Sequence, residues 1–376
     1  MVSNRTEDQR KGQPVPRVVI AAGGTAGHVV PALAIADELR DRGAEVSFLG
    51  ARGRLEAELV PKAGYEVDLL DLSGIDRKNP IKAARAALQA AAAIPRARRL
   101  IRSRGADAVL GGGGFVAGPA GVAARRLKLP LVLTEADRHL GLANRLLARR
   151  ADRVCLAFEI EGMDRPNVKV TGRPVGRAVL NADRDRARAR FGIAPEARCL
   201  LVMGGSQGAR TINLAAVEAL AERPGRSFDV VHVSGSRDYA QLRERLDAAP
   251  HRDGYTLLEY EPDMGDGIAA SDLALARSGG SVFELTALGR PAVLVPYPYA
   301  TADHQTANAE WMAGAGAATV VPDSELDADR LLVEVDGILG DPERLETMSE
   351  ASLGLARPEA AADVAGEVMS LIGGRP

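Results

Sequence analysis

Aromatic residues and cysteines are both scarce in this chain of 376 residues. Aromatic side chains make up 3% of the chain, and its two cysteines are Cys155 and Cys199. Two cysteines exclude a disulfide framework, and because both lie in apolar stretches we expect buried, reduced thiols. Charge of one sign is not in excess either, since 48 Lys and Arg against 50 Asp and Glu give a formal net charge of −2. This balance excludes a broadly basic nucleic-acid-binding protein.

Long hydrophobic runs are also missing. The longest candidate covers residues 86–94 and is ended by Pro95. Its length is half of the ~18 residues that a membrane-spanning helix needs. The first 16 residues are polar and lack the apolar centre of a signal peptide, so we expect a disordered segment at 1–16 and a cytoplasmic protein. Apolar residues nonetheless make up 46% of the chain, and its length predicts two or three domains at ~150 residues each.

Short β-branched runs alternate with helical stretches, which is typical of parallel sheets built from βαβ units. The pattern restarts at Cys199, where CLLVMGGSQGA echoes the earlier VVIAAGGTAGH. We therefore predict an α/β protein with two Rossmann-like domains facing each other across a cleft, at residues 17–175 and 176–355, and a helix at 356–376 that packs back on the first domain. The predicted strands are 17–22, 45–49, 66–70, 106–110, 130–133, 153–157, 199–203, 229–233, 256–258, 272–276, 292–295 and 318–321, and a first helix is predicted over 31–42.

Three glycine-rich loops follow predicted strands and precede predicted helices: GGTAGH (23–28), GGGGF (111–115) and GGSQGA (204–209). Backbone N–H groups in such loops, together with a helix dipole, suit the binding of a phosphate or another anion. The alternative is that each loop is only a tight turn between strand and helix. None of the loops reads G-x-G-x-x-G and none continues as G-K-[ST], so nicotinamide enzymes and P-loop ATPases are disfavoured.

His28 stands at the expected start of the helix that follows the first loop, near a cap at Thr25. Since a helix N-terminus disfavours imidazolium, a neutral histidine here is a candidate general base. A histidine that only bonds to its own turn is the alternative.

The stretch ARSGGSVFEL places Glu284 on the first turn of a helix, where a carboxylate either binds the hydroxyls of a sugar or interacts with the helix dipole. Farther on, polar side chains gather at another helix start, which suits a sugar ligand; they are Asp303, His304, Gln305 and Asn308.

Two further features have charged side chains. Asp183–Asp185 and Asp327–Asp329 form D-x-D strings inside charged helical stretches, which we interpret as solvated helix faces, and we predict no bound metal. Between Arg77 and Arg104 there are nine basic residues and no acidic one, with apolar residues between them. This segment is either an anionic membrane-binding surface or a solvated helix face.

The motifs GGTAGHVVPALAIADEL, GGGGFVAGPAGVAA, GGSQGARTIN, ARSGGSVFEL and DHQTAN occur in this order between residues 17 and 372, and the chain thereby resembles the MurG family. The resemblance implies a GT-B glycosyltransferase that needs no cofactor or metal. Its reaction would be the inverting transfer of GlcNAc from UDP-GlcNAc to the C4 hydroxyl of the muramyl sugar of undecaprenyl-linked lipid I. The product would be lipid II, made by a peripheral protein on the cytoplasmic face of the cell membrane.

The resemblance also implies roles for individual residues. His28 would be the base, with Asp137 as the other candidate. The UDP diphosphate would be held at Ser206, Gln207 and Gly208, the ribose at Glu284, and the uracil at the 260–264 segment, including Glu261 and Met264. The GlcNAc would be held by His304, Gln305 and Asn308. The acceptor diphosphate and the hinge would involve Thr25, Ala26, Gly27, Gly112, Gly113, Gly114, Arg173 and Arg177.

The chain departs from the family pattern on the acceptor side. Thr134–Asp137 reads TEAD where the family usually reads HEQN, Phe115 replaces a common Tyr, and the hinge sequence is GRPVG at residues 172–176. Three alternatives to this function are open. They are a related GT-B transferase with another acceptor, a catalytically impaired nucleotide-sugar-binding protein, and a UDP-GlcNAc 2-epimerase, whose family shares the fold.

Overall fold

The computed structural model describes residues 15–74, 80–205, 207–300 and 303–374. Most of the expected disordered segment at 1–16 lies outside these ranges. The chain divides into two compact units: unit 1 comprises Met1–Pro174 with Glu359–Pro376, and unit 2 comprises Val175–Pro358.

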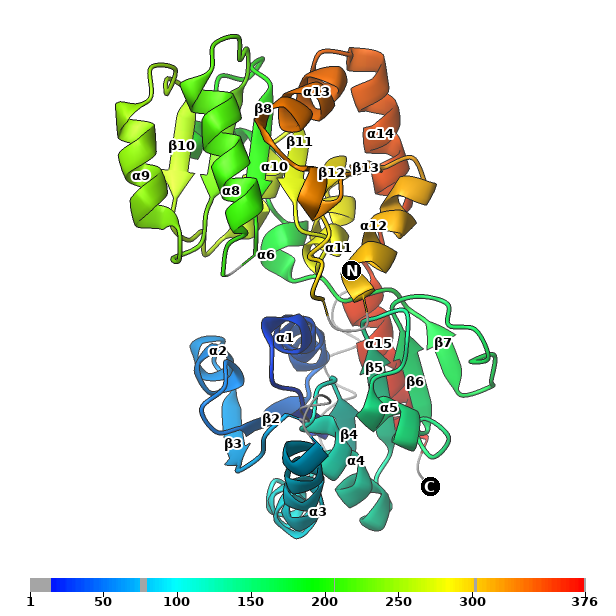
Figure 1. Ribbon diagram of the computed structural model, residues 1–376. Coiled ribbons are helices and arrows are strands. Elements are labelled where there is room, and N and C mark those ends of the chain that lie inside the picture. The colour runs from blue at the N-terminus through cyan, green and yellow to red at the C-terminus, as the bar shows by residue number, and fades with distance from the viewer. Residues whose placement is uncertain (1–14, 75–79, 206, 301–302, 375–376) are drawn as a thin grey trace, which may run out of the picture. The chain divides into compact units, whose positions relative to one another are not determined.

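Unit 1 contains a seven-stranded parallel sheet in the order β3-β2-β1-β4-β5-β6-β7 (Figure 1). Its strands are β1 (Arg17–Ala21), β2 (Glu45–Ala51), β3 (Glu66–Leu70), β4 (Ala108–Gly111), β5 (Leu131–Glu135), β6 (Arg153–Leu156) and β7 (Val168–Val170). Its helices are α1 (Ala26–Asp41), α2 (Glu56–Lys62), α3 (Pro80–Ser103), α4 (Ala117–Arg126), α5 (Leu142–Leu147) and α15 (Ala360–Gly373).

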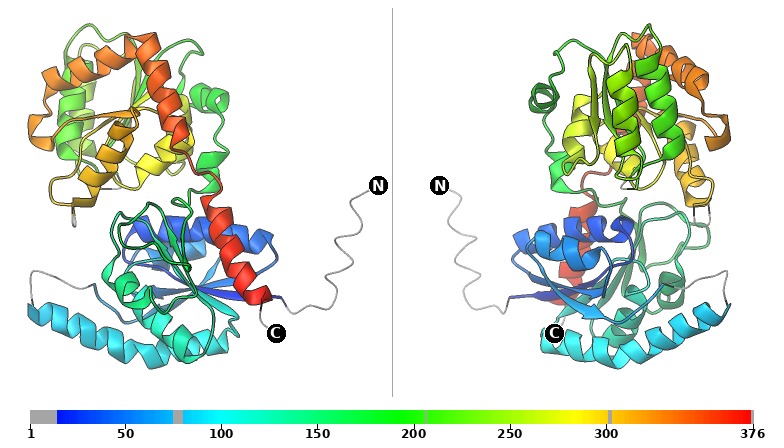
Figure 2. Two further views of the ribbon diagram at one scale, coloured as in Figure 1. Left: turned by 90° about the vertical axis from the view of Figure 1, so that its right-hand side faces the viewer. Right: turned by 60° about the vertical axis from the view of Figure 1, so that its left-hand side comes forward.

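Both faces of this sheet are buried, which is why β1 is a continuous apolar run rather than an alternating one. Val18 and Ile20 pack in one core with side chains of α1 and α15, whereas Val19 and Ala21 pack in a second core with side chains of α3 and α4. Figure 2 shows α15, in red, beside the sheet of unit 1. Its Glu367 pairs with Arg153 at 2.6 Å, so the end of the chain is fixed to β6.

Unit 2 contains a six-stranded parallel sheet in the order β10-β9-β8-β11-β12-β13. Its strands are β8 (Cys199–Met203), β9 (Asp229–Val233), β10 (Tyr255–Leu258), β11 (Leu273–Ala276), β12 (Ala292–Leu294) and β13 (Ala318–Val320). Its α-helices are α6 (Arg177–Leu180), α7 (Arg184–Phe191), α8 (Arg210–Val217), α9 (Tyr239–Ala248), α10 (Met264–Ala270), α11 (Ser281–Ala287), α12 (His304–Gly314), α13 (Ala328–Leu339) and α14 (Pro342–Gly354). The described part of unit 2 also contains the π-helical η2 (Glu218–Glu222) and the 3₁₀ turn η4 (Asp323–Glu325).

The prediction of two parallel α/β sheets is confirmed, and every predicted strand is present with its ends within two residues. Two expectations were wrong in detail. The short edge strand β7 was not predicted, and the helix predicted over 31–42 begins five residues earlier, at Ala26. The cap expected at Thr25, with His28 in the first turn, is where the structure has it. Cys155 and Cys199 are buried free thiols as expected, and burial raises the pKa of each to about 12.

Candidate active site

The two glycine loops of unit 1 contact each other. Strands β1 and β4 are parallel neighbours, so the loops that follow them leave the same edge of the sheet. A Cβ on Gly114 would lie 2.0 Å from the carbonyl oxygen of Gly23, and a Cβ on Gly112 would lie 2.9 Å from the Cβ of Ala22. Glycine is therefore required by the close approach of the two loops, and Gly114 also has a positive φ of 74°.

Glu56 holds the first of these loops. Its carboxylate is fully buried and accepts hydrogen bonds from the backbone N–H of Gly24 (3.1 Å) and of Ala51 (2.9 Å). A Cβ on Gly23 would lie 2.2 Å from Glu56 Oε1, which explains the double glycine. This residue was missed in the sequence, because a glutamate at a helix start is usually a surface residue.

His28 lies in the first turn of α1 and faces the second loop. Its Nδ1 is 3.1 Å from Thr25 Oγ1, and a Cβ on Gly113 would lie 2.5 Å from its Cδ2. Burial is the main cause that lowers the pKa of His28, and the charge of Arg173 lowers it further. Asp137, Glu56 and a hydrogen bond to the Gly23 backbone act in the opposite direction. Because the lowering causes prevail, the imidazole is neutral at neutral pH and able to accept a proton.

A small pocket opens beside this turn. It is lined by residues from the start of α1, the ends of β4, β5 and β6, the segment after β7 and helix α15: Gly27, Pro31, Gly112, Thr134, Glu135, Ala136, Cys155, Thr171, Gly172, Arg173, Pro174 and Val364. Of the residues assigned to the acceptor side from the sequence, Gly27, Gly112 and Arg173 line this pocket, whereas Arg177 is the first residue of α6 in unit 2. Arg173 is 8% exposed and donates from Nη2 to the carbonyl of Gly27 at 2.8 Å.

Glu135 organises the altered TEAD segment. Its carboxylate accepts from the N–H groups of Gly141 (2.8 Å), Ala136 (3.1 Å) and Asp137 (3.3 Å) and from the side-chain amide of Asn144 (3.0 Å). Burial raises its pKa, against these hydrogen bonds. The carboxylate therefore shapes the loop from 136 to 141, while Asp137 lies close enough to His28 to affect its protonation.

In unit 2 the third glycine loop connects β8 to α8. Ser206 lies outside the described residues, whereas Gln207 and Gly208 lie within them. Gly208 has a φ of 75°, and a Cβ there would lie 2.1 Å from the carbonyl oxygen of Ser234 at the end of β9. Asn213 of α8 donates to that same carbonyl at 2.9 Å, so the loop and the end of β9 are held together.

A buried polar chain continues from Asn213. Its Oδ1 is 3.0 Å from His232 Nε2, and His232 Nδ1 is 2.7 Å from the hydroxyl of Tyr255. Because Asn213 Nδ2 donates to Ser234 and to Asp238 (3.0 Å), its Oδ1 accepts from His232, and His232 in turn accepts from Tyr255. Complete burial lowers the pKa of His232 to about 3, so this ring is neutral. Nothing in the sequence indicated that His232 lies in a buried polar network.

The segment from 260 to 264 leads into α10 and is fixed by α7. Glu261 is 2% exposed and accepts two hydrogen bonds from Arg190 (2.7 and 2.9 Å), which makes it a positioning carboxylate. Met264 is the first residue of α10. The aspartates of the two D-x-D strings are exposed, as expected for solvated helix faces, and Asp183 and Asp327 cap helices. The arginines of α7 were not predicted to contact α10, and Arg188 among them is buried.

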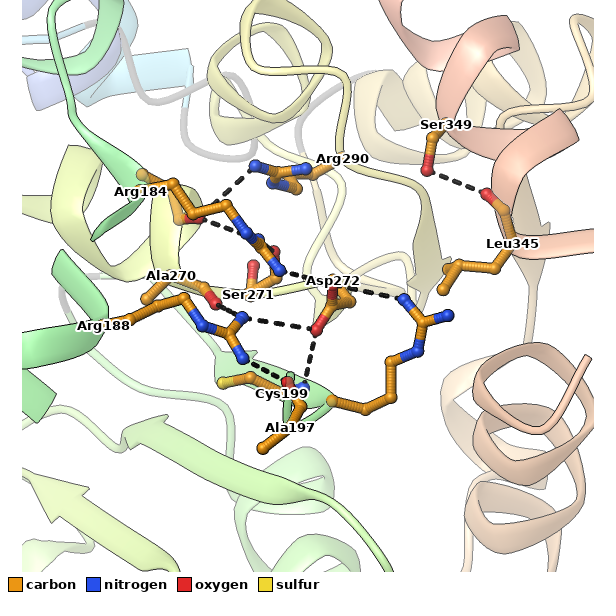
Figure 3. Close-up of polar contacts among 12 residues, drawn as sticks. Arg184, Arg188, Ala197, Cys199, Ala270, Ser271, Asp272, Arg290, Leu345 and Ser349 are labelled. Carbon is orange, nitrogen blue, oxygen red and sulfur yellow. Dashed lines mark hydrogen bonds and ion pairs between the residues drawn. The ribbon is translucent and has the colours of Figure 1, made fainter. Parts of the chain in front are cut away.

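Figure 3 shows where two of the α7 arginines point: Arg184 and Arg188, together with Arg290 from the loop before β12, surround the end of α10 and Asp272. Arg184 donates to the carbonyls of Ala269 and Ser271 and to Asp272, and Arg188, 2% exposed, donates to Ala270. The last carbonyls of a helix have no partner within it, and these cations satisfy them. Such support fixes α10 and, through it, the 260–264 segment.

The turn after β11 contacts the start of α12, where several of the remaining predicted residues lie. Ser278 donates to the Gln305 carbonyl at 2.8 Å and its own carbonyl accepts from Asn308 at 3.0 Å. Glu284 is in the first turn of α11, which follows this turn, and His304 begins α12. Asn308 is 2% exposed, so its amide attaches α12 to the turn, while Gln305 Oε1 accepts from the N–H of Tyr297 at 3.0 Å.

Comparison with known proteins finds one matching family domain in each of the two units. Residues 18–156 match the glycosyltransferase family 28 N-terminal domain and residues 199–364 match the C-terminal domain of that family. The chain is 43% identical over 353 residues to the UDP-N-acetylglucosamine–N-acetylmuramyl-(pentapeptide) pyrophosphoryl-undecaprenol N-acetylglucosamine transferase of Methylococcus capsulatus, with 93% of this chain and 97% of the relative covered.

Solved structures show the same similarity. MurG of Acinetobacter baumannii superposes with a TM-score of 0.74 at 29% identity, covering 95% of this chain and all of that one. The calicheamicin glycosyltransferase CalG4 gives a TM-score of 0.70 at 18% identity, covering 96% of this chain and 99% of that one, which is a similarity of fold.

Proposed function

The chain belongs to glycosyltransferase family 28 and has the GT-B fold, and we propose that it transfers GlcNAc from UDP-GlcNAc to lipid I and so forms lipid II. The observation that carries this function is the 43% identity to a transferase of that name over nearly the full length of both chains. The similarity also confirms the resemblance to the MurG family.

In the proposed mechanism, unit 1 binds the acceptor and supplies the base. With Nδ1 beside Thr25 Oγ1, the nitrogen of His28 that takes the proton from the C4 hydroxyl of the muramyl sugar is Nε2. The hydroxyl oxygen attacks C1 of GlcNAc as the bond from C1 to the β-phosphate oxygen breaks, and the configuration inverts. A neutral histidine is required for this step, and burial together with Arg173 favours that form by lowering the pKa of the ring.

Unit 2 binds UDP-GlcNAc in the same proposal. The diphosphate lies at the loop from 204 to 208 and the start of α8, where backbone N–H groups meet the negative charge that develops on the departing UDP. Glu284 accepts from the ribose hydroxyls, and His304 and Gln305 hold the GlcNAc. Glu261 and Asn308 contribute by fixing the backbone around the ligand, because their side chains are buried and bonded within the protein.

The substrate is a lipid, and α3 is the surface we propose for docking to the membrane. None of the described helices is both long and apolar enough to cross a bilayer. On α3, Ala86, Ala93, Ala97 and Ile101 face the core, whereas Ile81 (80% exposed) and Leu88 (72% exposed) face outward. Arg99 shares the outward face of Leu88, eleven residues on, with exposed arginines on either side. Apolar contacts flanked by cations suit an anionic lipid surface.

Turnover of UDP-GlcNAc with and without lipid I tests the function. We expect lipid II and UDP in equal amounts when lipid I is present, and no consumption of the donor without it. Mass spectrometry of the products separates the alternatives, since a 2-epimerase converts UDP-GlcNAc alone and a binding protein converts nothing. Either of those results would contradict the proposed function.

A further inference from the structure

The first turn of α1 lacks one of its own hydrogen bonds. In an α-helix the carbonyl of residue i accepts from the N–H of residue i+4, so the carbonyl of Gly27 would accept from residue 31. Residue 31 is Pro31, which has no N–H. Arg173, 146 residues farther along the chain, supplies the missing donor: its Nη2 donates to Gly27 O at 2.8 Å.

This contact is adjacent to His28 in the sequence. The carbonyl that Arg173 holds belongs to the peptide bond between Gly27 and His28, so the orientation of that peptide and the position of the imidazole are coupled. Arg173 is 8% exposed, so its charge acts through protein rather than through bulk water. Four groups of unit 1 influence the protonation of His28: Arg173 opposes the charged form, whereas Asp137, Glu56 and the Gly23 backbone favour it.

We propose that Arg173 is a positioning residue for His28, which fixes the first turn of α1 by donating the hydrogen bond that Pro31 cannot donate. This inference rests on the proposed role of His28 as the base. It differs from the diphosphate contact that the family resemblance implies, because the contact it rests on is the hydrogen bond from Nη2 of the buried Arg173 to a protein carbonyl. Its charge has a second effect, namely to keep the imidazole neutral.

The charge is tested by titrating His28 directly. The chain has five histidines, so NMR of histidine-labelled protein resolves the His28 ring with a His28→Gln sample for assignment. In Arg173→Gln the pKa of His28 is expected to rise, because a cation near the ring is lost. In Arg173→Lys, which keeps the charge, it is expected to stay near the wild-type value. Arg150→Gln, an exposed arginine of the same unit, is the matched control and leaves the titration unchanged.

The hydrogen bond is tested through Pro31. Pro31→Ala gives residue 31 an N–H that can donate to Gly27 O, so it replaces the contact of Arg173 without its charge. We expect Arg173→Gln to lower kcat about 10-fold or more at a pH where His28 is fully neutral, by misplacement of the base. In the Pro31→Ala background the same change is expected to cost less, while the shift of the His28 titration remains. Should Arg173→Gln fail to fold, Arg173→Lys in both backgrounds provides the same comparison of kcat.

Two results would overturn the proposal. The first has two parts. The pKa of His28 is the same in Arg173→Gln as in the wild type, and Arg173→Gln lowers kcat by the same factor in the wild-type and Pro31→Ala backgrounds. The other is an increase in the KM for lipid I at unchanged kcat, which would make Arg173 a substrate-binding residue. A His28→Ala variant with full turnover would contradict the role of His28 as the base, and the NMR titration would still report whether Arg173 acts on the ring.

Discussion

The ring of His28 occupies the space that a side chain at Gly113 would fill. A Cβ there would lie 2.5 Å from His28 Cδ2, and Gly113 has a φ of 96°. The second glycine loop of unit 1 thus forms one wall of the site of the proposed base. The imidazole can take this position only because Gly113 has no side chain.

Gly113→Ala is therefore expected to reduce turnover by displacing His28, in addition to a backbone strain of about 1–2 kcal/mol. Gly53 is a matched control, because it also has a positive φ (68°) but no atom lies within 4 Å of a Cβ placed there. Urea denaturation is expected to show that both variants lose stability, whereas kcat falls only in Gly113→Ala. Equal kcat values in the two variants would show that the contact with His28 has no role in the reaction.

Glu284→Ala is expected to weaken the binding of UDP, because the ribose hydroxyls lose a charged acceptor worth roughly 1.5–3 kcal/mol. Isothermal titration calorimetry with UDP measures the change as a rise in Kd of about 10-fold or more. Glu310→Ala, which removes an exposed carboxylate from α12 of the same unit, serves as the control. An unchanged Kd for Glu284→Ala would contradict the contact of this carboxylate with the ribose.

The arginines on the outer face of α3 are expected to support binding to vesicles that contain phosphatidylglycerol. Each basic residue near an anionic surface contributes about 1 kcal/mol before screening by salt. Arg98, Arg99 and Arg102 changed together to Gln should reduce co-sedimentation at low salt, and Arg125, Arg126 and Arg150 changed to Gln form the control set in the same unit. Vesicle binding that survives the change in α3 and is insensitive to salt would leave this helix as a solvated surface.

His232 is expected to make the free energy of unfolding depend on pH. Its folded pKa of about 3 lies below its ordinary value near 6.5 because of complete burial. The unfolded chain therefore binds a proton that the folded chain does not, and stability falls as the pH decreases from about 6.5 towards 3. The difference in stability between wild type and His232→Gln should shrink steadily over this range. A difference that stays constant from pH 7 to pH 4 would show that the ring accepts a proton in the folded protein.

The sheets and glycine loops could be predicted because their signals are local. Apolar runs such as β8 followed by Gly-Gly pairs indicate buried parallel strands and close backbone turns without any knowledge of distant residues. One contact of α1 could not be predicted in this way. The cap at Thr25 and the place of His28 in the first turn were predicted, whereas the carbonyl oxygen of Gly27 is satisfied by Arg173 from far along the chain.

The supporting carboxylates of the site were missed for the same reason. Glu56 and Glu135 resemble surface residues in the sequence, and their burial depends on N–H groups that the folded loops bring to them. The arginines of α7 likewise have the pattern of a solvated charged helix, whereas in the fold α10 supplies carbonyls and acids for them to contact. These are long-range contacts, which neither local propensity nor hydrophobic periodicity contains.

Removal of the His28 imidazole tests the assignment of the acceptor side most directly. With saturating UDP-GlcNAc and lipid I, His28→Ala is expected to lower kcat by about 10²–10⁴-fold and to leave the Kd for UDP nearly unchanged. Since the pKa of His28 lies below its ordinary value, the wild-type rate should rise through an acid limb below about pH 6.5 and then level off, and this limb should vanish in the variant. A variant that keeps most of its kcat, shows a raised KM for lipid I and retains the acid limb would contradict the role of His28 as the base and transfer it to another group, with Asp137 the first to examine.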